Sequence, residues 1–333
     1  MKTSEAVKIG AWAVIAGCCA GHPGEVTGAT GGSTAPVVPA KEEFVAITVE
    51  AAAARLWPEQ GPRAYAAASA EQRAALAVLV GRMLTEDATP TGLGADAAAA
   101  GYVVEGWLLG GDRVLVAVEQ ESGRRGGGAY LVRVGGAGAE LLQAPHGFFD
   151  VGTERIGLEM FVEDRGWRAL FVNTIHRYVG TDGVKRRQDD SPADPCHNAE
   201  HLLAVATAGA LGRVAGARVV QLHGFGDDED GAGFAAIVSG GTKPAPAHAG
   251  VVAVRLRAAL DGLRVALFPD DTDRLGATTN VEGRAVRAFN ERGGAPATFV
   301  HVELSAAVRR QLRADPELRR RVAAALHAPA SGP

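Results

Sequence analysis

From residue 141 onward, short apolar runs with strand character alternate with segments of helical character. The expected strands span 141–144, 169–174, 218–222, 235–239, 263–268 and 299–304, and the expected helices span 153–162, 198–211 and 251–260. Alternation of this kind is typical of α/β proteins. The sequence therefore predicts an α/β fold with a mixed, largely parallel sheet flanked by helices.

The region before residue 141 has a different pattern. Helices are expected at 44–57 and 71–84, followed by three strands at 102–109, 113–119 and 129–134 that glycines separate. Closely spaced strands with turn residues between them favour an antiparallel meander. We expect a helical N-terminal region at 41–100 and, at 101–330, an α/β domain, which the motifs below make similar to zinc hydrolases. Near the C-terminus, Asp315 is expected to cap a last helix that begins at Pro316.

The N-terminus resembles a bacterial lipoprotein signal. Lys2 and Lys8 precede an apolar run at 9–16, which is too short to span a bilayer as a stable helix. The run ends in Ile-Ala-Gly-Cys, and in this class of signals the cysteine, here Cys18, carries the lipid. We expect a signal peptide at 1–17, a flexible tether at 18–40 and an extracytoplasmic protein held to the membrane by a lipid anchor. Secretion through an ordinary signal is the alternative.

Charge and cysteine content exclude other classes of protein. The net charge of -4 and the absence of a long basic run argue against a nucleic-acid partner. Three cysteines, of which Cys18 is the expected lipid site, make a disulfide framework improbable. We expect Cys196 to be a buried or incidental thiol, since no activating pattern surrounds it. The chain also lacks the Gly-x-Ser-x-Gly motif of serine hydrolases.

Histidines and carboxylates follow the expected strands where those strands end. His146 and Asp150 lie in a glycine-containing loop after the strand at 141–144, and His223 follows the strand at 218–222. Functional sites of open α/β sheets gather at the carboxyl ends of strands. Two histidines and a carboxylate suit a catalytic zinc ion, because they leave one coordination position open. Thr153 is expected to cap the helix that follows the loop.

A late carboxylate completes this hypothesis. His301 and Glu303 share one face of the strand at 299–304, and Val300, Val302 and Leu304 share the other. Glu303 can take a proton from an attacking water and return it to a leaving amine. We expect His301 to support the site from outside the ligand set.

These motifs together resemble a known family. The stretch His-Gly-Phe-Phe-Asp-Val-Gly-Thr-Glu at 146–154, Leu-His-Gly at 222–224 and Val-Glu-Leu-Ser at 302–305 resemble phage-type poly-γ-glutamate hydrolases. They are similar, more distantly, to N-formylglutamate amidohydrolases and the zinc carboxypeptidase-like fold. The resemblance covers about 141–310. It implies a Zn²⁺-dependent hydrolase that cleaves an amide bond in a peptide, a γ-glutamyl compound or an N-acyl amino acid.

The resemblance also implies roles for single residues. His146, Asp150 and His223 would bind zinc, and Glu303 would be the general base. Asn173 and Arg177 would bind a substrate carboxylate or polarise the carbonyl, although three residues separate them where the wider fold has an adjacent pair.

This chain departs from the family pattern at the acidic ligand. Phe149 occupies the fourth place of the His-x-x-Glu spacing, so either Asp150 or Glu154 can supply the carboxylate. A degenerate, non-catalytic envelope lipoprotein that binds a ligand or partner is the alternative function.

The remaining histidines carry weaker signals. His197 and His201 share a face of the expected helix at 198–211, which Asn198 is expected to cap. The Glu that follows the first histidine in the metalloprotease helix motif is absent here. We therefore expect a cleft-lining or structural role for these two histidines, with His197 as a candidate to line the cleft and bind substrate.

Overall fold

The computed structural model describes residues 43–58, 64–187, 190–226 and 233–327. The expected signal peptide at 1–17, the lipidation site Cys18 and the tether at 18–40 lie outside these residues. The described residues form a ten-stranded mixed sheet in the order β1-β2-β3-β4-β6-β5-β7-β10-β8-β9. Its strands are β1 (Val45–Ala46), β2 (Tyr102–Leu109), β3 (Asp112–Glu119), β4 (Ala129–Arg133), β5 (Glu140–Ala144), β6 (Trp167–Val172), β7 (Arg218–Phe225), β8 (Ala236–Ser239), β9 (Val265–Leu267) and β10 (Thr298–Ser305).

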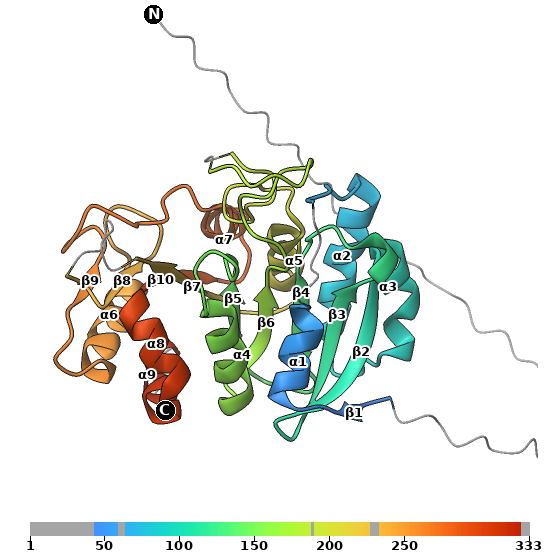
Figure 1. The fold of residues 1–333 in the computed structure, drawn as a ribbon, viewed down its shortest axis with the longest axis horizontal. Helices are drawn as coiled ribbons and strands as arrows, with labels where there is room; N and C mark the ends of the chain where they lie inside the picture. The colour runs from blue at the N-terminus through green and yellow to red at the C-terminus, as the bar shows by residue number, and fades with distance from the viewer. Residues whose placement is uncertain (1–42, 59–63, 188–189, 227–232, 328–333) are drawn as a thin grey trace, which may run out of the picture. The chain divides into compact units, whose positions relative to one another are not determined.

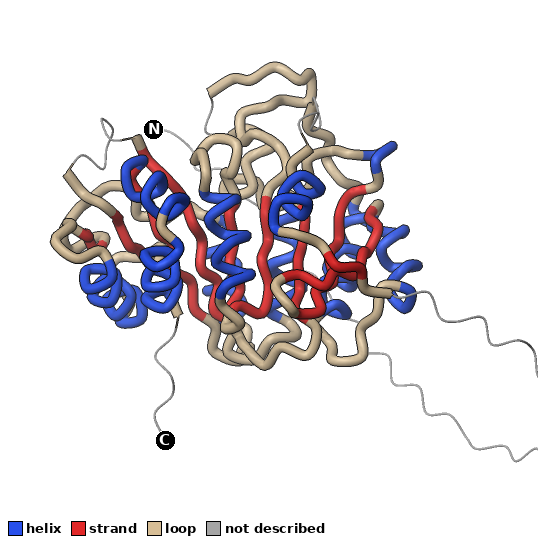
Figure 2. The backbone as a smooth tube through the Cα atoms, turned by 60° about the horizontal axis from the view of Figure 1, so that its bottom comes forward, coloured by secondary structure: helices blue, strands red, loops and turns tan. Residues whose placement is uncertain are grey.

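The centre of the sheet is parallel. Strands β6, β5, β7 and β10 pair in parallel with one another, in that order, and the meander β2–β3–β4 joins this centre through an antiparallel β4–β6 pair. On the other side β8 runs antiparallel to β10. Figure 2 shows these strands crossing the fold between helices. The predicted α/β class, the largely parallel sheet and the antiparallel meander are confirmed.

Helices cover both faces of the sheet, and each face has its own apolar cluster. One face packs on α1 (Val49–Leu56), α4 (Thr153–Glu163), α6 (Ala247–Ala259), α8 (Ala306–Ala314) and α9 (Pro316–Leu326). The other packs on α2 (Ala70–Met83), α3 (Gly94–Ala100), α5 (Leu202–Leu211) and α7 (Val281–Glu291). Two single 3₁₀ turns lie at Thr91–Leu93 and Glu121–Gly123. In Figure 1 helices α1, α4, α8 and α9 lie in front of the strands.

The segment before β5 extends the sheet and covers one face of it. The strands β1 to β4 continue the sheet beyond β6, and α2 packs against α3 and α5. The apolar cluster of α2 and α3 is continuous with that of the central strands. Within the described residues no helix is both long enough and apolar enough to cross a bilayer.

The helix ends test the predicted caps. Asp315 is the N-cap of α9, with its side chain accepting from the backbone of Glu317 and Leu318, as predicted. The cap predicted at Thr153 is wrong, because α4 begins at Thr153 and Gly152 is its N-cap, with a φ of 94° that favours glycine. The cap predicted at Asn198 is also wrong, because α5 begins four residues later and His201 caps it.

The face of the sheet that α5 and α7 cover becomes polar toward the carboxyl ends of the central strands. Side chains alternate between faces along a strand, so every second residue shares this face. Apolar residues lead into polar ones on three adjacent strands: Leu141 and Gln143 on β5; Val219, Gln221 and His223 on β7; Phe299, His301 and Glu303 on β10. This polar end of the sheet carries the candidate site.

Candidate metal centre

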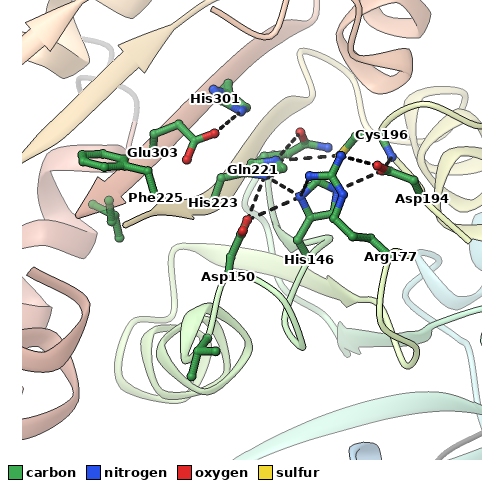
Figure 3. Close-up of polar contacts among 12 residues, drawn as sticks. His146, Asp150, Arg177, Asp194, Cys196, Gln221, His223, Phe225, His301 and Glu303 are labelled. Carbon is green, nitrogen blue, oxygen red and sulfur yellow. Dashed lines mark hydrogen bonds and ion pairs between the residues drawn. The ribbon is translucent and has the colours of Figure 1, made fainter. Parts of the chain in front are cut away.

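Three predicted ligands converge at the carboxyl end of β5 and β7. The Nδ1 atoms of His146 and His223 are 3.1 Å apart. Oδ2 of Asp150 is 3.4 Å from the first of these nitrogens and 3.2 Å from the second. All three side chains are buried. Figure 3 shows them pointing toward one another. We call these three atoms the donor triangle.

Glycines allow the chain segments around the triangle to approach closely. A Cβ on Gly224, next to His223, would lie 1.9 Å from the guanidinium of Arg309. That guanidinium donates to the carbonyl oxygens of Val151, Phe225 and Leu304, and so ties the 145–152 loop to the ends of β7 and β10. A larger residue at position 224 would displace this contact and loosen the loop that carries Asp150.

The opposite nitrogen of each histidine ring has its own partner. Nε2 of His146 is 2.9 Å from Oδ1 of Asp194, a carboxylate with no exposed surface. Nε2 of His223 is 3.3 Å from Oε1 of Gln221. An acceptor at Nε2 places the proton of a neutral imidazole there and leaves the lone pair on Nδ1. Both lone pairs then face Asp150, which is also an acceptor.

The donor triangle fits a zinc ion. Two imidazole nitrogens and a carboxylate oxygen converge in the triangle, and two imidazoles with a carboxylate are a set that zinc prefers. Ligands bound tetrahedrally at about 2.0–2.1 Å lie about 3.3 Å apart. The sides of the triangle, 3.1, 3.2 and 3.4 Å, match that separation. Asp194 and Gln221 supply the outer contacts that commonly orient histidine ligands.

The electrostatics of the site also favour a cation. Burial alone would lower the pKa of His146, but the acidic groups around it reverse this and raise that pKa well above its ordinary value. Burial likewise opposes the ionised form of Asp150, yet its contacts with the two histidines hold the pKa of its carboxyl well below the usual range. For His223, burial dominates and lowers the pKa to about 4. The surroundings therefore favour the ionised form of Asp150 and a positive charge on His146, and they disfavour a positive charge on His223.

Glu303 lies next to the donor triangle. It pairs in register with His223 across β7 and β10, and its Oε1 is 3.4 Å from Nε2 of His301. Its Oε2 is buried without a hydrogen-bond partner. Burial, followed by the charge of Asp150, raises the pKa of Glu303 to about 8. The carboxyl group can therefore exchange a proton near neutral pH.

A cavity of about 320 Å³ opens over the donor triangle. The predicted residues Arg177, His197 and Glu303 line it together with the three ligands, and Arg187 lines it as well. Arg177 forms an ion pair with Asp194, and its Nη1 is 3.2 Å from Nδ1 of His146. Asn173 is not among the described lining residues. Its Oδ1 accepts from the backbone of Thr174 and Ile175, so it holds the turn after β6.

The structure also separates the two candidate acidic ligands. Asp150 contacts both histidines, whereas Glu154 lies in the first turn of α4 with its side chain against Gly147. A Cβ on Gly147 would lie 2.8 Å from Cβ of Glu154. Burial raises the pKa of Glu154 to about 7. The geometry favours Asp150 as the ligand.

Several neighbouring side chains were assigned minor roles from the sequence. His201 caps α5 and stacks on Tyr65, which is a structural role as expected. His301 lines the cavity, and its ring centroid is 4.4 Å from that of His223. Cys196 is buried, as expected, and its Sγ is 3.8 Å from Nε2 of His223. Burial raises the pKa of its thiol to about 12, so at neutral pH it is not a thiolate.

Sequence reasoning did not identify Asp194 and Gln221 as parts of the site. Asp194 belongs to none of the motifs in the sequence, and Gln221 stands there only as part of the apolar strand at 218–222. The place of Gln221 is predictable from the strand period, because Gln221 precedes His223 by two residues and therefore shares its face of β7. Asp194 has no such signal, since its position depends on the path of the long connection between β6 and α5.

Among known proteins, some solved structures resemble this chain in fold, at low sequence identity. No protein-family model and no curated protein matches the chain. The zinc-free form of YNDL is 17% identical, with a TM-score of 0.30 over 53% of this chain and 70% of that one. A candidate metallopeptidase from Shewanella amazonensis is 13% identical, with a TM-score of 0.31 over 65% and 79%. An aspartoacylase family protein from Mesorhizobium loti is 15% identical, with a TM-score of 0.34 over 68% and 67%. Likeness at this level says nothing about shared chemistry, which has to come from the residues of the site.

Proposed function

We propose that this protein is a zinc-dependent hydrolase that cleaves an amide bond. One observation carries the proposal: two imidazole nitrogens and a carboxylate oxygen lie 3.1–3.4 Å apart beneath a cavity, which is the separation of ligands around a tetrahedral zinc ion. His146, Asp150 and His223 would hold the ion. When bound, zinc lowers the pKa of water and polarises a carbonyl oxygen.

The protein's own residues would handle the protons. Ligand atoms of Glu303 and His223 lie within 4.8 Å of each other, so Glu303 would take a proton from an attacking water, and its pKa, raised to about 8, suits it to hold that proton. It would then deliver the proton to the leaving amine nitrogen. His301, 3.4 Å from Oε1 of Glu303, would restrict the rotation of the carboxyl group.

Arg177 would orient the substrate. Its guanidinium lines the cavity, and its ion pair with the buried Asp194 fixes its position. From there it can pair with a substrate carboxylate or stabilise negative charge that develops on the carbonyl oxygen. Arg187 and His197 add polar groups on the same wall, which favours a polar or anionic small molecule or peptide.

Metal content and turnover of purified protein test this function. We expect about one zinc per chain in the wild type and none in His223→Ala. His248→Ala is the matched control, because His248 bonds the backbone of Phe299 and is not among the described cavity residues. Glu303→Gln should keep the metal and lose at least about 100-fold in turnover of N-acyl amino acids, γ-glutamyl compounds or peptides.

Two results would overturn the proposal. Folded protein that takes up no zinc, or Glu303→Gln with wild-type turnover, would each contradict it. The first result would favour a non-catalytic envelope protein that uses the cavity to bind a ligand.

We also propose that the protein is an extracytoplasmic lipoprotein anchored through Cys18. The support is the sequence at 9–18, since that segment lies outside the described residues. Full-length protein should incorporate labelled fatty acid and sediment with membranes, and Cys18→Ala should do neither. Membrane association that survives Cys18→Ala would argue against the anchor.

A further inference from the structure

We propose that Gln221 is a positioning residue that fixes the proton of His223 on Nε2. The orientation of the Gln221 amide is set in turn by a chain of hydrogen bonds through buried side chains, and this chain ends at two backbone groups. The effect of this tautomer on zinc affinity rests on the proposed function. The proton position itself is a property of the chain without metal. The residues involved are nearly or fully buried: Gln143, Thr207, Gln221, His223 and Asn280.

The first anchor is a backbone N–H group at the start of α7. The amide of Gly283 donates to Oδ1 of Asn280 at 3.0 Å, because a backbone N–H can only donate. Nδ2 of Asn280 therefore points the other way, and it donates to Gln221 at 2.8 Å. The atom of Gln221 that receives this bond has to be its oxygen, Oε1.

The second anchor is a backbone carbonyl in α5. The oxygen of Leu203 can only accept, so the Thr207 hydroxyl donates to it at 2.8 Å. The hydroxyl oxygen then accepts from Nε2 of Gln143 at 2.8 Å. The free Oε1 of Gln143 accepts from Nε2 of Gln221, again at 2.8 Å. This path, independent of the first, assigns the same orientation to the Gln221 amide.

The two anchors together decide the tautomer of His223. Oε1 of Gln221 is 3.3 Å from Nε2 of His223, and an amide oxygen cannot donate. A proton on Nε2 satisfies the contact, whereas a lone pair there would face the oxygen. The Cys196 thiol, 3.8 Å from the same nitrogen, is a much weaker partner. The lone pair of Nδ1 is therefore turned toward Asp150 and His146.

The amide chain has a chemical purpose at this place. Without it, a proton on Nδ1 of His223 would donate to Oδ2 of Asp150, 3.2 Å away, and would block the donor triangle. A metal would then bind only after this proton moved. The chain removes that competing state before the metal arrives. Loss of such an outer contact costs about 10–100-fold in metal affinity.

The test compares variants of Gln221 in the full protein. Gln221→Met keeps the length of the side chain and removes the acceptor, while Gln221→Glu keeps an acceptor. Tyr130→Phe is the matched control, because it removes another buried hydrogen bond, from Tyr130 to the Gly127 carbonyl, on the same face of the sheet. Thermal unfolding of each variant checks that the fold is intact.

Two readouts are measured. Nitrogen-15 NMR of labelled histidine in metal-free protein reports which ring nitrogen of His223 carries the proton, with His223→Ala to identify the signal. Competition with a chelator of known affinity gives the zinc Kd. We expect Nε2–H in the wild type, Tyr130→Phe and Gln221→Glu. Gln221→Met should shift toward Nδ1–H and bind zinc about 10–100-fold more weakly.

The outcomes separate this inference from the proposed function. A wild-type His223 with its proton on Nδ1 would overturn the inference, and so would a Gln221→Met protein with an unchanged tautomer. An Nε2–H tautomer that Gln221→Met abolishes, in a protein that never binds zinc, would support the positioning role while the zinc hydrolase proposal fails. A zinc Kd that is the same in Gln221→Met and Tyr130→Phe would show that the contact has no role in metal binding.

Discussion

At the scale of single residues, the site depends on which carboxylate is the ligand. Asp150 contacts the Nδ1 atoms of both histidines, whereas the Glu154 side chain packs against Gly147. Asp150→Asn would replace an anionic donor with a neutral amide in a buried site. We expect its zinc affinity to fall by more than about 100-fold, because a missing ligand costs more than a missing outer contact.

Glu154→Gln is the matched control for this prediction. The same change of acid to amide, made four residues after Asp150, should leave zinc affinity within about threefold of the wild type. Titration of both proteins against a zinc chelator measures the difference. The reverse order of affinities would identify Glu154 as the ligand and would require the 145–152 loop to rearrange on binding.

The residues that sequence reasoning found share a property. His146, Asp150, His223 and Glu303 follow or occupy strands whose apolar pattern is clear, so the strand-end rule predicted that they would meet. The outer partners could not be found in this way. Asp194 reaches His146 from the segment 190–201 that precedes α5, and no local sequence pattern encodes that contact.

At the scale of elements, His327 joins three parts of the fold. Its Nε2 is 2.9 Å from Oδ2 of Asp164 after α4, and its Nδ1 is 3.3 Å from Oε2 of Glu140 in β5. Its ring packs on Trp167 at 4.1 Å between centroids. Burial would lower the pKa of His327, but the two carboxylates outweigh it and raise that pKa from 6.5 to about 9.

The raised pKa predicts a dependence of stability on pH. The unfolded chain binds this proton less tightly, so the stabilisation is complete below about 6.5 and is lost as pH rises through about 9. His327→Gln should lower the free energy of unfolding at pH 6 by about 1–2 kcal/mol, after allowance for partial exposure. Urea unfolding from pH 6 to 9.5 should show the deficit shrinking. A deficit that is constant across this range would mean that packing on Trp167 alone accounts for it.

The elements missed from the sequence were those that tertiary contacts define. Strand β1 has two residues, and its pairing with β2 is what makes it a strand. Helix α7 buries only four residues, one of them Glu282, so its apolar pattern is too sparse to recognise. Helix α3 is a short alanine-rich segment without a polar face to mark it. By contrast, the central strands are buried along their whole length, which is why their continuous apolar runs could be located.

At the scale of the whole described fold, the candidate site belongs to the central strands, and the meander does not take part in it. The metal donors come from the segment after β5 and from β7, and the cavity residues come from β7, from β10 and from the segments that follow β5, β6 and β9. None of the described residues of β2 to β4 lines the cavity. The meander therefore extends the sheet and its core without shaping the chemistry.

Zinc bound at the donor triangle would stabilise the native fold. An ion that binds only the native state stabilises it by about 2.7 kcal/mol at 100 times its Kd. Chelation should therefore lower the melting temperature by several degrees in the wild type. The His223→Ala protein, which lacks a ligand, should not respond to the chelator.

Hydrogen exchange would show where that stabilisation acts. Removal of zinc should increase amide exchange in 145–152, the loop that carries two ligands, and in 190–200, which holds Asp194 against His146. Exchange in β2 and β3 should change little, because local opening near the site does not require the meander to unfold. Equal changes throughout the sheet would instead indicate that the metal acts only through global unfolding. No change in either region, with zinc shown to bind, would place the ion outside the donor triangle.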